Sequence, residues 1–308
     1  MILSICIATF NRSKYLKESL QSIVGQFDDP EVAKNVNVYV LDNISEDNTK
    51  EVVLKFVDHF ENIVLIEDNK RRDMAKGIVK SASLGDGNYL WVFSDDDLMI
   101  AGCLKKIITV LQKTPADLLL LNIDSFVEKN RTHRTNLFKE SENRYFNNRR
   151  EFWLYLNTKF YYDIDYFTTY CSNWILKKNY FDKTKQLFEI YNKKLDLFPF
   201  PSLVFYSDLD FSAQIIAESL VMFRADNASW VRKNPICNFF YSDSLWRHHY
   251  NLIVSTNREF LPLGFAFKVS IKNLLRIKDL LFLFLVLILK KIGLFNFVGN
   301  LYKKIRFK

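Results

Sequence analysis

The feature of this sequence that most constrains its fold is the alternation, over the first 123 residues, of short apolar runs with amphipathic stretches. The runs are rich in Val, Ile and Leu and do not alternate with polar residues, which is typical of parallel strands buried on both faces. They predict strands at residues 2–9, 36–41, 63–66, 89–94 and 117–122.

The stretches between these runs favour helices with one buried face, because their apolar residues recur at spacings of three and four. They comprise Leu16, Leu20, Ile23 and Val24; then Val52, Val53, Phe56, Val57 and Phe60; then Met74, Ala75, Ile78, Val79 and Ala82. Repeated strand–helix–strand units predict an α/β fold with a doubly wound, mostly parallel sheet and right-handed crossovers. Ligands bind such sheets beyond the carboxyl ends of the strands.

The pattern changes after residue 123. Residues 124–150 are polar and basic, with Arg131, Arg134, Arg149 and Arg150, and they favour a surface loop or a mobile lid. A helix is expected from Asp208 to Ser219, followed by a short strand from Leu220 to Arg224.

Charge is unevenly distributed along the chain. Ten of the 43 Lys and Arg, but only one of the 35 acidic residues, lie from Lys268 to the end. The remainder is therefore nearly neutral, which argues against a nucleic-acid-binding protein, because such a body carries a basic face of its own.

Four cysteines, at Cys6, Cys103, Cys171 and Cys237, are too far apart in sequence for the spacing of a structural zinc site. They suggest a reduced, cytosolic protein, with Cys6 as a small buried residue. Met1 leads directly into the first apolar run, so no signal peptide is expected.

The basic C-terminal segment, residues 265–308, contains an unbroken apolar run from Leu280 to Leu289 with basic residues on both sides. Ten helical residues span about 15 Å, roughly half the hydrocarbon core of a bilayer. We therefore expect a helical tail that lies on an anionic membrane surface without crossing it. The alternative is a C-terminal core helix.

Polar clusters follow three of the predicted strands. Thr9 to Ser13 follow the first, Asp42 to Thr49 follow the second, and Ser94-Asp95-Asp96-Asp97 follow the fourth. Successive carboxylates repel one another unless a cation neutralises them, and Mg²⁺ or Mn²⁺ prefers such oxygens. The alternative is a solvated acidic loop that caps the next helix.

These clusters resemble the signatures of glycosyltransferase family 2, which has the GT-A fold. They are Ile7-Ala8-Thr9-Phe10-Asn11-Arg12, then Val40-Leu41-Asp42-Asn43 through Thr49, and then Tyr89 through Asp97, in the family's order and spacing. The resemblance covers residues 1–123. It implies a sugar nucleotide donor, a Mn²⁺ or Mg²⁺ cofactor, and transfer that inverts the anomeric centre.

The resemblance also implies roles for individual residues. The nucleotide-binding residues would be Thr9, Asn11, Arg12, Asp42, Arg72 and Asp95, and the metal would be held by Asp96 and Asp97. Asp42 would accept a hydrogen bond from the base, and Asp95 would lie near the ribose. Ser94 stands where many relatives have the first Asp of Asp-x-Asp, which leaves the division of roles among the three carboxylates open. Thr9 and Asn11 would otherwise shape a turn, and Arg72 would otherwise belong to a solvated basic run.

The acceptor hydroxyl needs a general base, which in the family follows the metal motif. The catalytic residues expected on this ground are Asp208 and Asp210, whose alternative role is helix capping; Asp163 and Asp165 are weaker choices. One of His248 and His249 is a further possible metal ligand, with a packing role as the alternative.

Together these features predict a nucleotide-binding half at residues 1–123, an acceptor-binding half at 124–264 and a tail at 265–308. The acceptor implied by the resemblance is a saccharide or a lipid-linked saccharide, and the location is cytoplasmic, on the inner face of the membrane. A nucleotidyltransferase would need a Gly-rich phosphate loop near the N-terminus, and none is present. A non-catalytic membrane scaffold would not need Asp42, Asp95 and Asp96.

Overall fold

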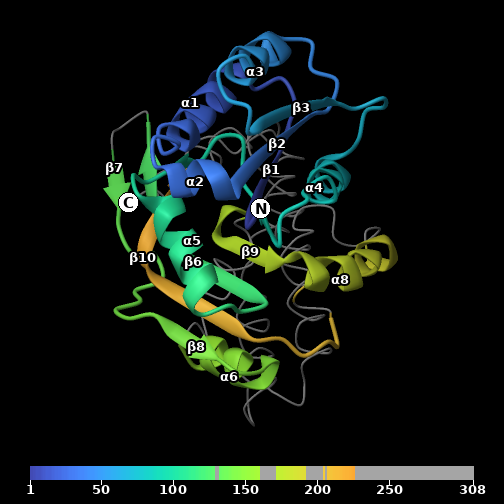
Figure 1. Ribbon diagram of the computed structural model, residues 1–308. Helices are drawn as coiled ribbons and strands as arrows, with labels where there is room; N and C mark the ends of the chain where they lie inside the picture. Colours follow the sequence, from blue (N-terminus) through green and yellow to red (C-terminus); the bar gives the residue numbers. More distant parts are fainter. Residues whose placement is uncertain (129–131, 160–170, 192–203, 205–206, 226–308) are drawn as a thin grey trace, which may run out of the picture. The chain divides into compact units, whose positions relative to one another are not determined.

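The elements of the fold are described by a computed structural model, which defines residues 1–128, 132–159, 171–191, 204 and 207–225 (Figure 1). In chain order they are β1 (Leu3–Thr9), α1 (Ser13–Val24), α2 (Pro30–Asn35), β2 (Val36–Asp42), α3 (Thr49–Val57), β3 (Ile63–Glu67), α4 (Met74–Ala82), β4 (Tyr89–Val92), β5 (Leu98–Met99), α5 (Cys103–Lys113), β6 (Leu118–Val127), β7 (Thr132–Arg134), β8 (Arg144–Phe146), α6 (Arg149–Lys159), η1 (Cys171–Asn173), β9 (Trp174–Lys177), α8 (Lys178–Tyr191) and β10 (Ala213–Arg224).

One sheet contains all the described strands. Its order is β3-β2-β1-β4-β9-β6-β10-β5, with β7 paired to β6 and β8 paired to β10. Strands β3, β2, β1 and β4 run parallel, as the sequence predicts, and β6 and β10 also pair in parallel. The short strand β9 lies antiparallel between β4 and β6. The expected α/β architecture is therefore confirmed, as a mixed sheet in which parallel pairing dominates.

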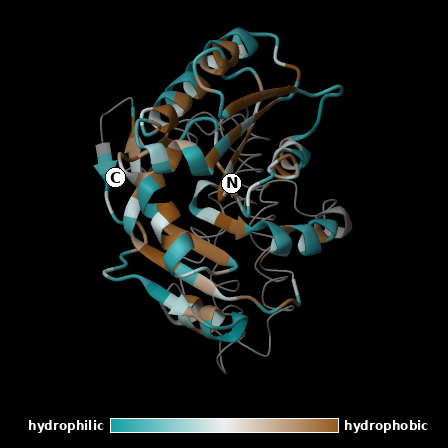
Figure 2. Ribbon diagram, in the orientation of Figure 1, coloured by the Kyte–Doolittle hydropathy of each residue, from teal (hydrophilic) through white to brown (hydrophobic). Residues whose placement is uncertain are grey.

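Helices cover both faces of the central strands. All four residues of β4 and nearly all of β1 are buried, which is why their sequences show no polar alternation. The predicted face of α1 is also confirmed, since Leu16, Leu20 and Ile23 are buried. The face predicted for α4 is confirmed at Ala75 and Ala82, whereas Met74 is exposed. In Figure 2 the strands are mostly brown, whereas the helices carry brown and teal on different sides.

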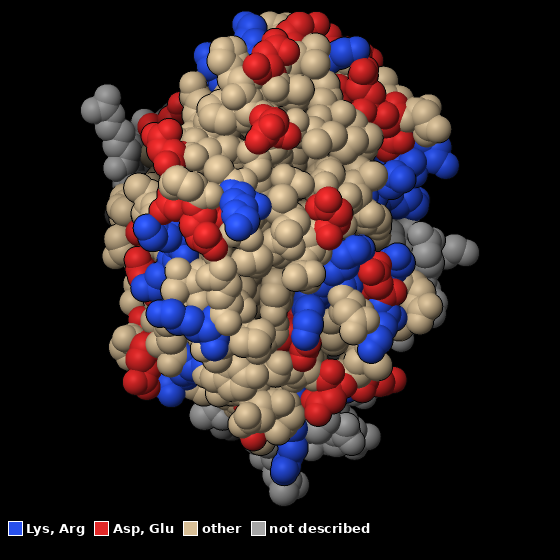
Figure 3. Space-filling model, in the orientation of Figure 1, with Lys and Arg blue, Asp and Glu red and all other residues tan. Residues whose placement is uncertain are grey.

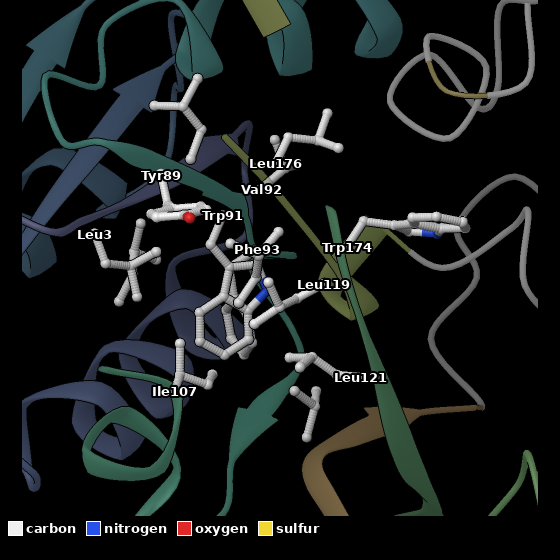
Figure 4. Packing of buried hydrophobic residues seen from close by; sticks show 14 of the residues in the cluster. Leu3, Tyr89, Trp91, Val92, Phe93, Ile107, Leu119, Leu121, Trp174 and Leu176 are labelled. Atoms are coloured by element: carbon white, nitrogen blue, oxygen red, sulfur yellow. The ribbon is translucent and has the colours of Figure 1, made fainter. Parts of the chain in front are cut away.

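Large aromatic side chains fill the centre of the core. Trp91 and Phe93 meet edge to face with ring centroids 5.2 Å apart. Figure 4 shows them close to Ile107 of α5 and Leu119 of β6. The indole N–H of Trp91 donates to the carbonyl of Ser172 at 2.8 Å, so the buried ring has its polar atom satisfied. This packing fixes the end of β4, where the acidic run begins.

The sequence predicts a surface loop or mobile lid at residues 124–150, but much of this segment forms strands and the start of a helix. Strand β6 continues to Val127 and pairs with β7 in an antiparallel hairpin, and β8 and the start of α6 follow. The turn between β7 and β8 is anchored inside the protein, because Phe138 is buried and its N–H donates to the side chain of Asn122 at 3.1 Å. The segment is so rich in polar residues that its sequence shows no apolar pattern from which these contacts could be predicted. The expected boundary after residue 123 falls within β6.

The helix expected from Asp208 to Ser219 is also wrong. The structure has the long strand β10 there, parallel to β6. Its apolar residues fit a helical period, but Ile215, Ile216 and Val221 are fully buried, on a strand that pairs with β6 on one side and with β5 and β8 on the other. Branched side chains suit a pleated surface, and pairing with β6 outweighs the local periodicity. The pairing with β6 has a register shift between Ile216 and Ser219, so the residues between these two need not follow the inward–outward alternation of a regular strand.

Several expectations concern residues outside the described ranges. They include Asp163, Asp165, His248, His249, Cys237 and the whole tail. None of the helices in the described ranges has the length and apolar character needed to cross a membrane. On the face seen in Figure 3, acidic and basic side chains are interspersed.

Candidate functional site

The carboxyl ends of β1 and β2 bring two of the predicted polar clusters together. Thr9 pairs with Asp42 in the parallel register, and the N–H of Asn43 donates to the Thr9 carbonyl at 3.0 Å. Asn11 adopts a left-handed conformation, with φ of 51°. Its side chain accepts from the N–H of Glu46 at 2.7 Å, while its own N–H donates to Ser45 Oγ at 2.9 Å. Asn11 therefore does shape a turn, and that turn joins the two loops.

The acidic run after β4 joins the same group. Thr9 Oγ1 donates to Asp95 Oδ2 at 2.8 Å, and both residues are buried. Residues 9–13, 42–49 and 94–97 thus meet at one edge of the sheet, as the parallel-strand argument predicts. The structure places them together; the chemical role of each remains a prediction.

Arg12 supplies a cation to this edge. Its Nε lies 2.8 Å from Asp95 Oδ1, in ionic contact without hydrogen-bond alignment, and its Nη2 donates to Asp96 Oδ2. Burial disfavours the charged guanidinium, but Asp95 and Asp96 outweigh this effect and raise the pKa of Arg12. The acidic run was expected to need a divalent ion for neutralisation, and here a side chain provides much of it.

The carboxyl group of Asp95 titrates at higher pH than a solvated one. Burial raises the pKa of Asp95, Arg12 lowers it, and the neighbouring Asp96 raises it again. Because a nearby cation favours the ionised form, any additional positive charge at this edge would lower that pKa.

Asp97 differs from its two neighbours, because both of its oxygens already accept hydrogen bonds. Oδ2 accepts from Ser172 Oγ at 2.6 Å, and Oδ1 accepts from the backbone N–H of Arg224 at 3.1 Å. Burial and the charge of Asp96 raise its pKa. These contacts point the carboxylate of Asp97 into the protein and fasten the turn. The metal contact expected for Asp97 from the sequence stays a prediction.

Asp42 and Arg72 lie further along the same edge. Asp42 Oδ1 accepts from the N–H and the hydroxyl of Ser45, at 3.1 and 2.6 Å. The guanidinium of Arg72 pairs with Asp68, and its backbone makes two 2.8 Å hydrogen bonds with the side chain of Asn43. Arg72 therefore stands beside the second loop and does not touch the acidic run.

Asp208 and Asp210 are not brought to this edge. Both are exposed and precede the amino end of β10. Asp210 Oδ1 accepts from the N–H groups of Arg149 and Phe211, at 2.7 and 3.0 Å. The last residue of β10, Arg224, contacts the acidic run, and the paired segment Leu118–Phe126 of β6 implies that the ends of β10 are roughly 26 Å apart.

The described residues fit a divalent ion only in part. Asp95 and Asp96 offer hard oxygen ligands, the type that Mg²⁺ and Mn²⁺ prefer. Within the described ranges, however, no group of three or more His, Cys, Asp or Glu side chains could hold a metal ion. Among the described residues, Asp95 and Asp96 would therefore supply only part of the ligand set of such an ion.

Two residues of the site were not predicted. Ser172 holds Asp97 and also accepts from the N–H of Ser94 at 2.9 Å. Arg224 was expected only as the last residue of a strand. Its one sequence signal is a charge that directly follows an apolar run, Leu220 to Phe223.

A parallel-dominated sheet with polar side chains at the carboxyl ends of β1, β2 and β4, carboxylates among them at β2 and β4, is the arrangement of nucleotide-binding α/β domains. Comparison with known families agrees: the model of glycosyl transferase family 2 matches residues 4–184. The chain therefore belongs to glycosyl transferase family 2.

Individual relatives are more distant. The chain is similar to the abequosyltransferase RfbV of Salmonella typhimurium, with 29% identity over 59% of this chain and 54% of that protein. It is also similar to the glycosyltransferase GlyG of Streptococcus pneumoniae, with 20% identity over 41% of this chain and 40% of that protein. The chain thus spans about half the length of these two relatives or less.

Solved structures share the fold. TarS of S. aureus, residues 1–349 in complex with UDP-GlcNAc, aligns with a TM-score of 0.59 at 16% identity, over 83% of this chain and 68% of that one. The same part of TarS in complex with UDP gives a TM-score of 0.57 at 17% identity, over 83% of this chain and 67% of that one. At this identity the likeness concerns the fold alone.

Proposed function

We propose that this protein transfers a sugar from a nucleotide diphosphate sugar to a saccharide or lipid-linked saccharide acceptor. The observation that carries the proposal is the convergence of Thr9, Asp42 and Asp95 at the carboxyl edge of the sheet. Family membership and the nucleotide complexes of TarS support a nucleotide sugar as the donor.

The proposed donor site runs along this edge. Asp42, whose Oδ1 is held by Ser45, accepts from the base, while Thr9 and Asn11 shape the backbone beneath the nucleotide. Asp95 lies near the ribose. Arg72 completes the rim of the base pocket through its contacts with Asn43.

Asp96 would hold Mn²⁺ or Mg²⁺, with oxygens of the donor's diphosphate as further ligands. Two observations support this arrangement: the described ligand set is incomplete, and Arg12 already pairs with Asp95 and Asp96. When bound, the metal stabilises negative charge on the departing diphosphate. Arg12 then leaves the carboxylates and meets the phosphates, so that its charge stays within the site.

The reaction is proposed to invert the anomeric centre, with a carboxylate that removes the proton from the acceptor hydroxyl. Asp208 and Asp210 are poorly placed for this role, because β10 separates them from the acidic run. We therefore assign the base to Asp163 or Asp165. Loss of turnover with retained donor binding in Asp163→Asn or Asp165→Asn would support this assignment, and loss only in Asp208→Asn or Asp210→Asn would contradict it.

The test of the donor site is the thermal unfolding of the full chain with UDP or GDP, in Mn²⁺ and in EDTA. A ligand present at 100 times its dissociation constant stabilises the folded state by about 2.7 kcal/mol. We expect stabilisation by at least one nucleotide, and a larger effect with Mn²⁺. Absence of any nucleotide effect would refute the proposal.

The protein is further proposed to work at the inner face of the cytoplasmic membrane, where the basic tail meets anionic lipid. The support is the concentration of Lys and Arg from Lys268 onward. Lipid-linked saccharide acceptors would be available there.

A further inference from the structure

Arg224 is a buried charged residue at the carboxyl end of β10, with only 3% of its surface exposed. It touches three segments that are distant from it in sequence: α1, the acidic run and the end of β6. A buried charge is costly unless it is paired and hydrogen-bonded, and the guanidinium of Arg224 is both.

Two of these contacts hold the backbone and side chains of the acidic run. The Nε–H of Arg224 donates to the carbonyl of Asp96 at 3.1 Å, and its backbone N–H donates to Asp97 Oδ1 at the same distance. Ser172 holds the other oxygen of Asp97. The turn that presents Asp96 is therefore fastened to β10.

The rest of the guanidinium is directed away from the acidic run. Its Nη1 donates to Glu128 Oε2 at 3.0 Å and its Nη2 to Glu18 Oε2 at 2.5 Å. It also lies near two aromatic rings, 5.2 Å from the centroid of Tyr15 and 4.7 Å from that of Phe126. These contacts fix the plane of the guanidinium group.

The two glutamates offset the charge of Arg224, which distinguishes it from Arg12. Arg12 binds the carboxylates of the acidic run directly, whereas the side chain of Arg224 binds a backbone carbonyl within that run. The planar fork of an arginine can serve three acceptors at once, and a lysine cannot reproduce this geometry. Arg224 therefore influences the position of Asp96 more than the net charge of the acidic run.

We propose that Arg224 is a positioning residue, which sets where Asp96 presents its carboxylate to the metal that accompanies the donor. This inference rests on the function proposed above. Groups that orient a metal ligand typically change metal affinity by about 10- to 100-fold when they are removed. The effect of Arg224 should therefore be specific to the metal-dependent part of donor binding.

The experiment is calorimetry of UDP and GDP binding to the full chain, with Mn²⁺ and with EDTA, for the wild type, Arg224→Lys and Arg224→Met. The matched control is Arg144→Met, because Arg144 also has carboxylate and aromatic partners, Glu142 and Tyr155, away from the acidic run. In both Arg224 variants we expect the tightening caused by Mn²⁺ to fall by about tenfold or more. Affinity in EDTA should stay near the wild-type value, and the control should retain the full Mn²⁺ effect.

A third variant keeps the test decisive if the Arg224 substitutions prevent folding. Glu18 is partly exposed on α1, so Glu18→Gln removes one anchor of the guanidinium without opening the core. We expect it to produce a smaller loss of the same Mn²⁺-dependent tightening.

The outcomes separate the two proposals. If the wild type binds nucleotide more tightly with Mn²⁺ and folded variants do so equally well, the role of Arg224 is refuted and the proposed function stands. An equal loss of affinity in EDTA and in Mn²⁺ would also refute it, because that pattern indicates general structural damage. If the wild type shows no Mn²⁺ effect, the proposed metal-dependent donor site and the role of Arg224 are both refuted.

Discussion

Substitution of Arg12 by glutamine should destabilise the protein and, at the same time, give it affinity for Mn²⁺ in the absence of nucleotide. Arg12 contacts both Asp95 and Asp96, and the side chains of the three residues are only 19%, 9% and 14% exposed. Glutamine keeps a polar side chain of moderate length but removes the cation. Two carboxylates would then face each other with the neutralising charge gone.

The size of the effect follows from the burial of the group. Removal of one partner from a buried ion pair costs about 3–5 kcal/mol, and the slight exposure of these side chains favours the lower end, near 3 kcal/mol. For a domain of 150–250 residues this corresponds to a fall in the melting temperature of roughly 6–12 °C.

The pH dependence gives an independent check on the cause. Burial raises the pKa of Asp95 in the folded state, so stability is lost as the pH rises from the unfolded value of 3.8 through the folded one. Arg12 lowers that pKa, and its removal extends the loss to higher pH. The deficit of Arg12→Gln should therefore be larger at about pH 8 than at about pH 5.

Thermal unfolding with EDTA and with Mn²⁺ measures both effects, and electron paramagnetic resonance of Mn²⁺ measures its binding directly. We expect Mn²⁺ to restore part of the stability of Arg12→Gln without nucleotide, while the wild type responds to Mn²⁺ only when nucleotide is present. Arg144→Gln, which also breaks ion pairs, is the matched control. A variant as stable as the wild type, or one that ignores Mn²⁺, would refute the argument.

Three further predictions follow from the proposed site. Asp96→Ala should abolish transfer, at a cost of several kcal/mol in transition-state energy, in a protein that remains folded; full activity would exclude Asp96 as the metal ligand. Asp42→Ala should weaken UDP or GDP binding by about tenfold, the equivalent of one net hydrogen bond, and calorimetry with unchanged affinity would contradict its contact with the base. Conversion of Lys290 and Lys291 to Gln should weaken co-sedimentation with anionic vesicles by roughly 30-fold at low salt, because each basic residue near the surface contributes about 1 kcal/mol. Equal binding would show that these two lysines do not contact the membrane.

Much of the fold follows from local sequence patterns. The bounds of the four parallel strands from β1 to β4 are predicted within two residues, because burial on both faces leaves unbroken apolar runs. Helices α1 and α4 follow from their apolar spacing. Strand β10 does not, because its side-chain period resembles that of a helix and only its partner β6 decides the conformation.

The same distinction separates the predictable part of the site from the rest. Thr9, Asp42 and Asp95 each end a strand, so parallel topology alone brings them together. Arg224 lies 127 residues beyond Asp97 in the sequence, and the hydrogen bond that joins them depends on a strand pairing that no local pattern reveals.

Arg12 and Arg224 stabilise the acidic run in different ways. Three adjacent carboxylates repel one another and need a cation, but an arginine can meet this need as well as a divalent ion. Arg12 pairs with two of the carboxylates, while Asp97 satisfies both of its oxygens with Ser172 and the backbone of Arg224. These contacts supply hydrogen-bond and ionic partners to all three carboxylates, and the side chains of Arg12 and Ser94 both bind Asp96, so a metal at Asp96 has to compete with them. For this reason Arg12 and Arg224 should respond differently to substitution: loss of the first opens the carboxylates to Mn²⁺, and loss of the second leaves them charged but misplaced.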